Sequence, residues 1–221
     1  MLLEIACFNR TSALQAAAYG ADRIELCEDY AAGGVTPSED VILHVHKNLG
    51  IPVFVMIRPR GGDFVYTRNE LELMKSQVLF CRDHGIDGIV FGILDDQKNI
   101  DRESCGMLLE LAGPMQATFH RAFDATEDAV TSLETLIDCG FDRVLTSGKC
   151  RTALEGASQL ASLHLQSEGR IVVVPGGGIR AANLEDIMQK TGASEFHSAA
   201  LDSTGFGVDE AEIRKMKTLL Q

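Results

Sequence analysis

The chain has 221 residues, of which 45% are hydrophobic, and this size and composition suit one large globular domain. Its formal net charge of −12 argues against nucleic acid or an anionic membrane as a partner, because both bind basic surfaces. The first ten residues, MLLEIACFNR, lack a basic lead before a long apolar stretch, and runs such as VFVMI are too short to cross a bilayer. We therefore expect neither a secretion signal nor a membrane span.

Short apolar runs alternate with amphipathic stretches from one end of the chain to the other. The predicted strands cover residues 2–7, 23–27, 53–58, 87–91, 115–120, 142–146, 171–174 and 194–198. The predicted helices cover residues 11–19, 38–48, 69–83, 102–112, 127–139, 151–167, 181–190 and 209–220. These eight strand–helix units fill residues 1–221 without a linker, which predicts a single domain.

A weak internal repeat supports this division. The segments YGADRIEL, HGIDGIVFG, CGFDRVLTSG and TGASEFHSA each place a glycine where a helix would end in the left-handed conformation. Strands that alternate with helices predict a parallel sheet, and eight of them predict a closed (β/α)8 TIM barrel. A doubly wound open sheet is the alternative, but CFNRTS, after the first strand, lacks the GxGxxG typical of that fold.

In such a barrel the functional residues lie at the carboxyl ends of the strands. Side chains alternate along a strand, so the apolar positions that face the helices reveal which neighbours face the barrel axis. In RIELCE, Ile24 and Leu26 face the helices. Glu25 and Cys27 then face the axis. The same reasoning assigns these polar residues to the interior: Glu4, Glu25, Arg58, Thr118, His120, Glu195 and His197. Because unpaired buried charges are costly, the set predicts either a ligand site or a salt-bridge network that fills the barrel.

Two glycine-rich loops predict an anion site at the same end of the barrel. TSGKCR (146–151) follows the sixth strand and PGGGIRAAN (175–183) follows the seventh, and exposed N–H groups in such loops bind anions. The candidate anion-binding residues are Ser147, Gly148, Gly176, Gly177 and Gly178. A positive rim would come from Arg58, Arg60, Arg121, Lys149, Arg151 and Arg180. The alternative is that the glycines only form tight turns and that solvent surrounds the basic residues.

Candidate acid–base residues complete the predicted site. In FHRAFD (119–124), His120 is a proton-transfer candidate, and Asp124 is placed to orient His120 or Arg121. The proposed catalytic residues are Glu25, Arg58, His120 and His197, with Arg58 neutralising developing charge. This set would suit a lyase, isomerase or hydrolase acting on a small anionic or phosphorylated metabolite.

Two cysteines offer a different chemistry. The six cysteines show no CxxC spacing, so we expect reduced thiols in the cytoplasm. Cys7 and Cys27 end the first two predicted strands, which would lie about 4.8 Å apart, and two thiolates there would bind a soft ion such as Cu(I) or Zn(II). Strand alternation opposes the pair, because Cys7 would face the helices if Glu4 faces the axis. Otherwise both cysteines are small buried hydrophobic residues.

Nine motifs, in order, resemble the copper homeostasis protein CutC family over nearly the whole chain: EIACFN, GADRIELCE, AAGGVTPS, VFVMIRPRGGDFVY, GIVFGIL, TFHRAFD, DRVLTSG, VVVPGGGI and EFHSAA. The resemblance implies a TIM barrel, a cytoplasmic homodimer and a role in copper handling. It also implies, as proposed for some members, a copper ion bound at the positions of Cys7 and Cys27. We therefore predict a copper homeostasis protein. The alternatives are the enzyme described above and a barrel that has lost its chemistry and serves only as an interaction protein.

Overall fold

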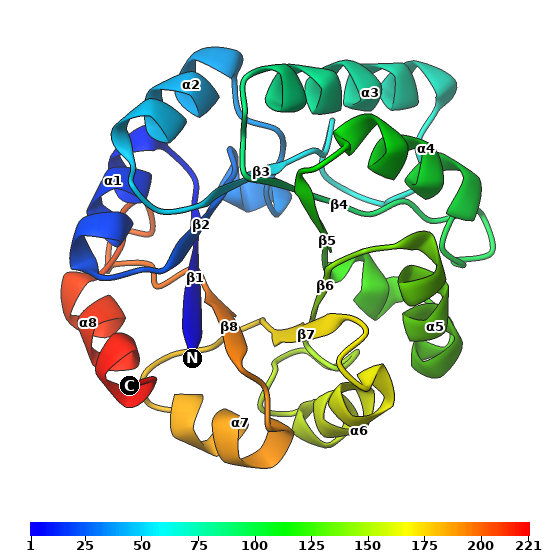
Figure 1. Cartoon of the computed structure of the whole chain (residues 1–221). Coiled ribbons are helices and arrows are strands. Elements are labelled where there is room, and N and C mark those ends of the chain that lie inside the picture. The colour runs from blue at the N-terminus through cyan, green and yellow to red at the C-terminus, as the bar shows by residue number, and fades with distance from the viewer.

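The computed structural model describes residues 1–221 and confirms the predicted TIM barrel. Eight parallel strands form a ring, with the helices outside it (Figure 1). The strands are β1 (Leu2–Cys7), β2 (Arg23–Leu26), β3 (Val53–Met56), β4 (Gly88–Phe91), β5 (Gln116–Phe119), β6 (Arg143–Thr146), β7 (Val172–Pro175) and β8 (Glu195–Ser198). Hydrogen-bonded ladders join them in the order β7-β6-β5-β4-β3-β2-β1-β8. No ladder joins β7 to β8, although the two strands are neighbours in the ring.

Each strand is followed by a helix on the outside of the barrel. The helices are α1 (Arg10–Tyr19), α2 (Glu39–Asn48), α3 (Arg68–Asp83), α4 (Arg102–Ala112), α5 (Ala129–Cys139), α6 (Ala157–Ser167), α7 (Leu184–Thr191) and α8 (Glu210–Leu219). None of them is both long enough and apolar enough to span a membrane. The repeated glycine behaves as predicted, because Gly20, Gly85, Gly140 and Gly192 all follow helices with φ between 67° and 108°.

The largest difference from the sequence prediction is the start of α6, which was expected at residue 151. Residues 151–156 form turns instead, because this segment packs against the loops after β6 and β7. The N–H of Ala153 donates to the carbonyl oxygen of Gly177 at 2.9 Å, and a Cβ on Gly156 would overlap the carbonyl oxygen of Ser147. Two short 3₁₀ helices, η1 (Tyr30–Ala32) and η2 (Arg121–Ala125), were not predicted, since such short segments carry no periodic signal.

Strand alternation sorts the buried side chains into two layers, as predicted. Ile24 and Leu26 belong to the large apolar layer between strands and helices, together with residues from all eight strands. A separate small cluster inside the barrel contains Cys27, Phe54, Met56 and Val90. The interior of the barrel is therefore partly apolar.

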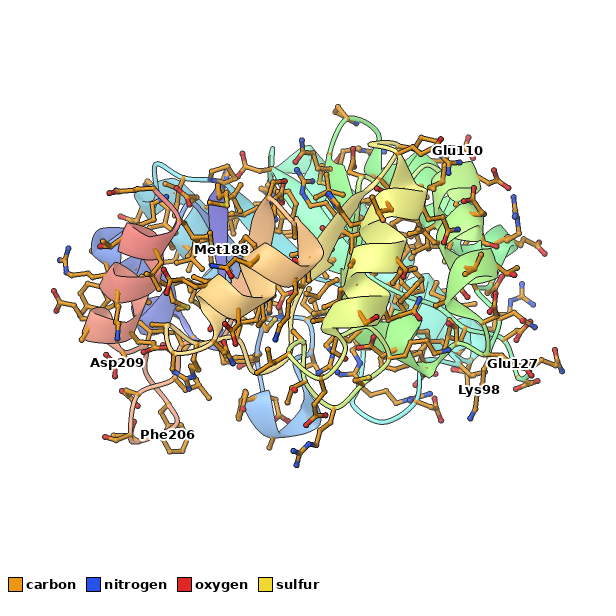
Figure 2. The ribbon with its side chains drawn as sticks, turned by 90° about the horizontal axis from the view of Figure 1, so that it is seen from below. Lys98, Glu110, Glu127, Met188, Phe206 and Asp209 are labelled. Atoms are coloured by element: carbon orange, nitrogen blue, oxygen red, sulfur yellow. The ribbon has the colours of Figure 1, made fainter.

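The loops that follow the strands gather at one end of the barrel. In the side view, Lys98, Glu127 and Phe206, from the loops after β4, β5 and β8, lie on one face, and Glu110 lies on the opposite face (Figure 2). We call the first face the mouth. It carries the carboxyl ends of all eight strands, where the sequence placed the functional residues.

Candidate functional site

The end of the barrel opposite the mouth is closed by an ion-pair network. Arg23 contacts Glu4 at 2.5 Å and Glu195 at 2.7 Å, and Arg143 contacts the same Glu195 oxygen at 3.0 Å. Both guanidinium groups also lie over the ring of Phe54, at 4.8 and 5.3 Å from its centroid. This part of the interior matches the salt-bridge interpretation of the sequence and fills the barrel.

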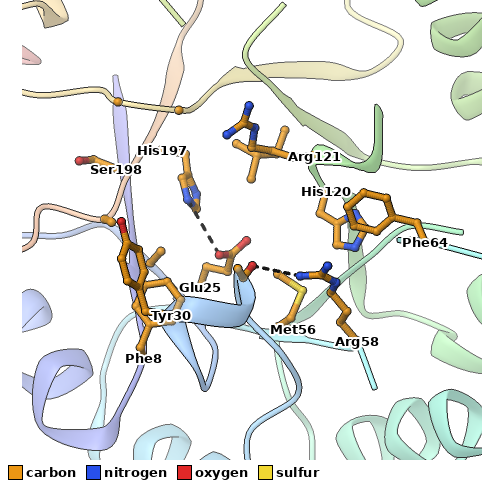
Figure 3. A pocket seen from close by; sticks show the side chains of 16 residues that line it. Phe8, Glu25, Tyr30, Met56, Arg58, Phe64, His120, Arg121, His197 and Ser198 are labelled. Atoms are coloured by element: carbon orange, nitrogen blue, oxygen red, sulfur yellow. Dashed lines mark hydrogen bonds and ion pairs between the residues drawn. The ribbon is translucent and has the colours of Figure 1, made fainter. Parts of the chain in front are cut away.

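The mouth end holds a cavity of about 270 Å³. Its lining includes Glu25, Met56, Arg58, His120, Arg121 and His197 (Figure 3). All four predicted catalytic residues therefore line one pocket, although they come from the second, third, fifth and eighth strands or the residues just after them. This is the convergence that strand alternation predicted.

Four polar side chains on one side of the pocket contact one another in succession: Glu4, His197, Glu25 and Cys27. His197 Nδ1 lies 2.7 Å from Glu4 Oε1, its Nε2 lies 3.9 Å from Glu25 Oε2, and Cys27 Sγ donates to Glu25 Oε2 at 3.4 Å. Ligand atoms of Glu4, Glu25 and His197 lie within 4.8 Å of one another. His197, however, turns a different nitrogen toward each carboxylate. The contacts therefore form a series of polar groups in which Glu4 orients the imidazole. They are not arranged as ligands around one metal ion.

Burial and neighbouring charges together shift the pKa values of these four side chains in different directions. Burial raises the pKa of Glu4, but Arg23 and His197 outweigh it and lower that pKa to about 2. Burial raises the pKa of the Glu25 carboxyl and, together with the Glu25 charge, raises that of the Cys27 thiol. Burial lowers the pKa of His197, but Glu25 and Glu4 outweigh it, and the net shift is upward. Glu4 is thus a carboxylate at neutral pH, whereas burial favours the neutral form of Glu25.

His120 lies on another wall of the pocket, and its orientation is fixed by the backbone. Its Nδ1 accepts the N–H of Ala122 at 3.3 Å, so the neutral ring carries its proton on Nε2. Gly92 makes this placement possible, because a Cβ there would lie 2.5 Å from Nδ1. Burial and the nearby Arg58 charge lower the pKa of His120 to about 3. The ring is therefore neutral at physiological pH, and its Nε2 has no hydrogen-bond partner.

Arg58 holds two mouth loops together. Its Nη1 donates to the carbonyl oxygens of Ala32 and Gly34 at 3.0 and 3.1 Å, and its Nη2 donates to that of Gly62 at 2.9 Å. The guanidinium also lies 4.9 Å from the centroid of Phe64. Of its donor atoms, Nε alone has no partner. Arg58 thus connects the loop after β2 to the loop after β3, while the sequence suggested only a charge-neutralising role.

Asp124 organises the loop after β6. Its carboxylate accepts the N–H groups of Ser147 and Lys149 at 3.1–3.2 Å, and it pairs with Arg121 Nε at 2.8 Å. Gly148 N–H donates to Thr146 Oγ1 at 2.9 Å. The predicted anion-binding donors of this loop are therefore engaged within the chain, and Asp124 orients Arg121 rather than His120.

The loop after β7 keeps donors free. The N–H of Gly176 donates to the carbonyl oxygen of Thr146 at 2.9 Å, but those of Gly177 and Gly178 donate to no group in the chain. Both glycines have positive φ, at 98° and 75°, and both line the pocket. An ideal Cβ on Gly177 would lie 3.3 Å from Arg121 Nη1, so this guanidinium borders the free N–H groups.

The rest of the predicted basic rim lies away from the pocket lining. Arg60 pairs with Asp63 and Glu70, and Arg151 pairs with Glu155. The other two basic side chains donate to carbonyl oxygens: Lys149 to those of Thr126 and Glu127, and Arg180 to that of Leu201. Only Arg58 and Arg121, of the six rim residues, line the pocket.

A model of the CutC family matches residues 1–202. The chain belongs to the CutC family. A human protein named copper homeostasis protein cutC homolog is 47% identical over 207 residues, which cover 94% of this chain and 76% of the human protein. A CutC protein from Xylella fastidiosa is 45% identical over 198 residues, covering 90% of this chain and 74% of that protein.

Solved structures agree with this assignment. The crystal structure of a CutC protein from Streptococcus agalactiae superimposes with a TM-score of 0.86 at 35% identity, covering 90% of this chain and 98% of that one. Phosphoribosylanthranilate isomerase from Thermotoga maritima superimposes with a TM-score of 0.65 at 14% identity, covering 99% and 96% of the two chains, and shares the fold alone.

The two cysteines that the CutC resemblance singled out lie on opposite faces of the barrel wall. Cys7 packs in the layer between strands and helices, where its thiol donates to the carbonyl oxygen of Ile5 at 3.7 Å. Cys27 packs inside the barrel. The backbone N–H of Cys27 donates to the carbonyl oxygen of Cys7 at 2.8 Å, so the two residues are neighbours whose side chains diverge.

Several residues of the site were not singled out in the sequence. Arg23 and Arg143 complete the ion-pair network, and Met56 and Phe64 line the pocket. Strand alternation could have identified three of them as facing the barrel interior. Arg23 is on the same strand face as Glu25. Arg143 precedes Val144, which faces the helices, and Met56 lies between Val55 and Ile57, which also face the helices. Phe64 comes from a loop, where alternation gives no information.

Proposed function

We propose that this CutC-family protein acts in copper homeostasis and binds Cu(I) at Cys27. Support comes from family membership, from the names of its curated relatives, and from the position of Cys27 on the interior face of the barrel wall. Cu(I) is soft and prefers thiolate and thioether sulfur to oxygen ligands.

A second sulfur lies beside Cys27. The ladder between β2 and β3 ends with the pair of Leu26 and Val55, and Cys27 and Met56 are the residues that come next on the two segments. Both side chains belong to the same interior cluster, and Met56 lines the pocket. The donor chemistry of Cys27 and Met56 therefore fits Cu(I). The packing of both side chains in one interior cluster is the observation that carries the residue assignment.

The pair of Cys7 and Cys27, which the family resemblance suggested, is the competing assignment. For both thiolates to reach one ion, Cys7 would have to leave the outer apolar layer, where it is fully buried. That requires the end of β1 to turn, whereas Cys27 and Met56 face the same way without rearrangement.

Anaerobic competition between the protein and a chromophoric Cu(I) chelator tests both assignments. We expect stoichiometric binding by the wild type, loss of binding in Cys27→Ser, and weakening of about tenfold in Met56→Leu, which keeps the shape but removes the sulfur. Cys7→Ser should bind as wild type does. Cys150→Ser is the matched control, because Cys150 is an exposed thiol outside the pocket.

Two results would change the conclusion. Cu(I) binding that survives Cys27→Ser rejects this site. Loss of binding in Cys7→Ser, with Met56→Leu unchanged, favours the cysteine pair and a rearranged end of β1. The proposed homodimer and cytoplasmic location are supported by the family resemblance, and light scattering and cell fractionation test them.

A further inference from the structure

Three buried polar atoms on the pocket walls have no partner. They are Glu25 Oε1, Arg58 Nε and His120 Nε2, and the three residues are only 4%, 5% and 4% exposed. Burying a polar atom without a hydrogen bond is costly, and most such atoms in folded proteins are satisfied. Their occurrence together on one cavity indicates a ligand that supplies the missing partners.

The chemistry of each atom specifies what it would bind. His120 Nε2 carries the ring proton, because Nδ1 already accepts the N–H of Ala122, so Nε2 requires an acceptor such as a carbonyl oxygen. Arg58 Nε adds a second donor on the same side of the pocket (Figure 3). Glu25 Oε1 is complemented by a ligand hydroxyl, which can donate to a carboxylate or accept from a carboxylic acid.

The same cavity also offers a place for an anion. The N–H groups of Gly177 and Gly178 are free, and Arg121 Nη1 lies beside Gly177. Arg121 is held there by its ion pair with Asp124 and by donation from Nη2 to Ser147 Oγ at 2.9 Å. Successive free N–H groups beside a guanidinium form a typical anion-binding concavity.

We propose that the mouth of the barrel binds a small hydroxycarbonyl compound that carries a phosphate or carboxylate group. The anion binds Gly177, Gly178 and Arg121, the carbonyl oxygen accepts from His120 Nε2, and the hydroxyl contacts Glu25 Oε1. A cavity of about 270 Å³ is at the small end of ligand pockets and suits a compound of this size. This site uses residues other than Cys27 and Met56, so it does not depend on the copper proposal.

The test uses metal-free, full-length protein in the presence of a chelator, so its result is independent of Cu(I) binding. Calorimetric titration at fixed ionic strength compares dihydroxyacetone phosphate and hydroxypyruvate with three incomplete probes. Dihydroxyacetone lacks the anion, glycerol 3-phosphate has a hydroxyl in place of the carbonyl, and inorganic phosphate is the anion alone. We expect at least one of the complete compounds to bind about tenfold more tightly than every incomplete probe. The tighter of the two identifies the anion as phosphate or carboxylate.

Variants assign each part of the ligand to its residue. Arg121→Gln should weaken the complete compounds about tenfold and leave dihydroxyacetone unchanged. His120→Phe should abolish the preference for dihydroxyacetone phosphate over glycerol 3-phosphate, and His120→Gln, which retains an N–H donor, should restore part of it. Arg151→Gln is the matched control, because Arg151 is 85% exposed and lies outside the pocket lining.

Circular dichroism of each variant confirms that it is folded. Failure of both complete compounds to bind more tightly than inorganic phosphate would overturn the proposal. So would binding that is the same in wild type, Arg121→Gln and the two His120 variants.

Discussion

Glu4 is the residue whose replacement gives the most direct test of the ion-pair network. Its side chain is 1% exposed and contacts Arg23 at 2.5 Å and His197 at 2.7 Å. These contacts lower its pKa from 4.5 to about 2. At about 1.4 kcal/mol per pKa unit, the folded state gains about 3 kcal/mol from ionised Glu4 at neutral pH. Measurements on other buried pairs, in which removal of one partner costs about 3–5 kcal/mol, agree with this value.

We therefore expect Glu4→Gln to lower the free energy of unfolding at pH 7 by about 3 kcal/mol. For a chain of this length, that corresponds to a melting temperature lower by about 6–12 °C. Because the folded-state pKa is depressed, the stabilisation is complete above pH 4.5 and is lost as the pH falls toward 2. The difference between wild type and variant should shrink over this range.

Urea denaturation followed by circular dichroism, at several pH values, measures both quantities. Asp138→Asn is the control, since Asp138 pairs with Arg102 on the surface and such pairs contribute about 1 kcal/mol or less. A Glu4→Gln variant that unfolds within about 1 kcal/mol of wild type at pH 7 would refute the reasoning. A difference that does not change with pH would refute the assigned protonation state.

Three further outcomes are expected. Gly156→Ala should destabilise the protein by about 1–3 kcal/mol in thermal melts, because its Cβ would overlap the Ser147 carbonyl oxygen; a neutral effect would contradict the observed packing. Thr67→Ala should cost about 1 kcal/mol by removing the capping box with Glu70 at the start of α3. The control is Thr135→Ala, because Thr135 is partly exposed in the interior of α5 and caps no helix. NMR titration should show His120 still neutral at pH 5, because its pKa is lowered to about 3; a midpoint near 6.5 would contradict its burial.

The fold could be predicted because two repeating sequence patterns, strand alternation and the glycine after alternate helices, do not depend on contacts between distant residues. Strand alternation identified the inward face of β2 from Ile24 and Leu26 alone, and the glycine that ends alternate helices marked where the next strand begins. The start of α6 could not be predicted this way. It depends on contact between Gly156 and the loop after β6, which is a tertiary interaction.

Sequence reasoning brought Glu25, Arg58, His120 and His197 together in one pocket, but it missed Met56 and Phe64 and gave only part of the contacts. Alternation places Glu25 and His120 inside the barrel, and the barrel fold brings their strand ends together. It does not show that Asp124 engages the N–H groups of Ser147 and Lys149, or that the donors of Gly177 and Gly178 stay free. Both facts depend on hydrogen bonds between loops that are distant in sequence.

The missing ladder between β7 and β8 has a consequence for how the barrel moves. Seven of the eight strand boundaries are held by backbone ladders, whereas β7 and β8 lie side by side without one. Across this boundary, Ser198 Oγ of β8 donates to the carbonyl oxygen of Ile179, in the loop after β7, at 2.7 Å. Opening at this boundary breaks no ladder hydrogen bonds, so we expect the wall to separate more readily here than at the other boundaries. Gly177 follows one of the two strands and Ser198 ends the other, and both line the pocket. A small molecule bound across them would connect the two edges, and amide hydrogen exchange in both strands would slow as a result.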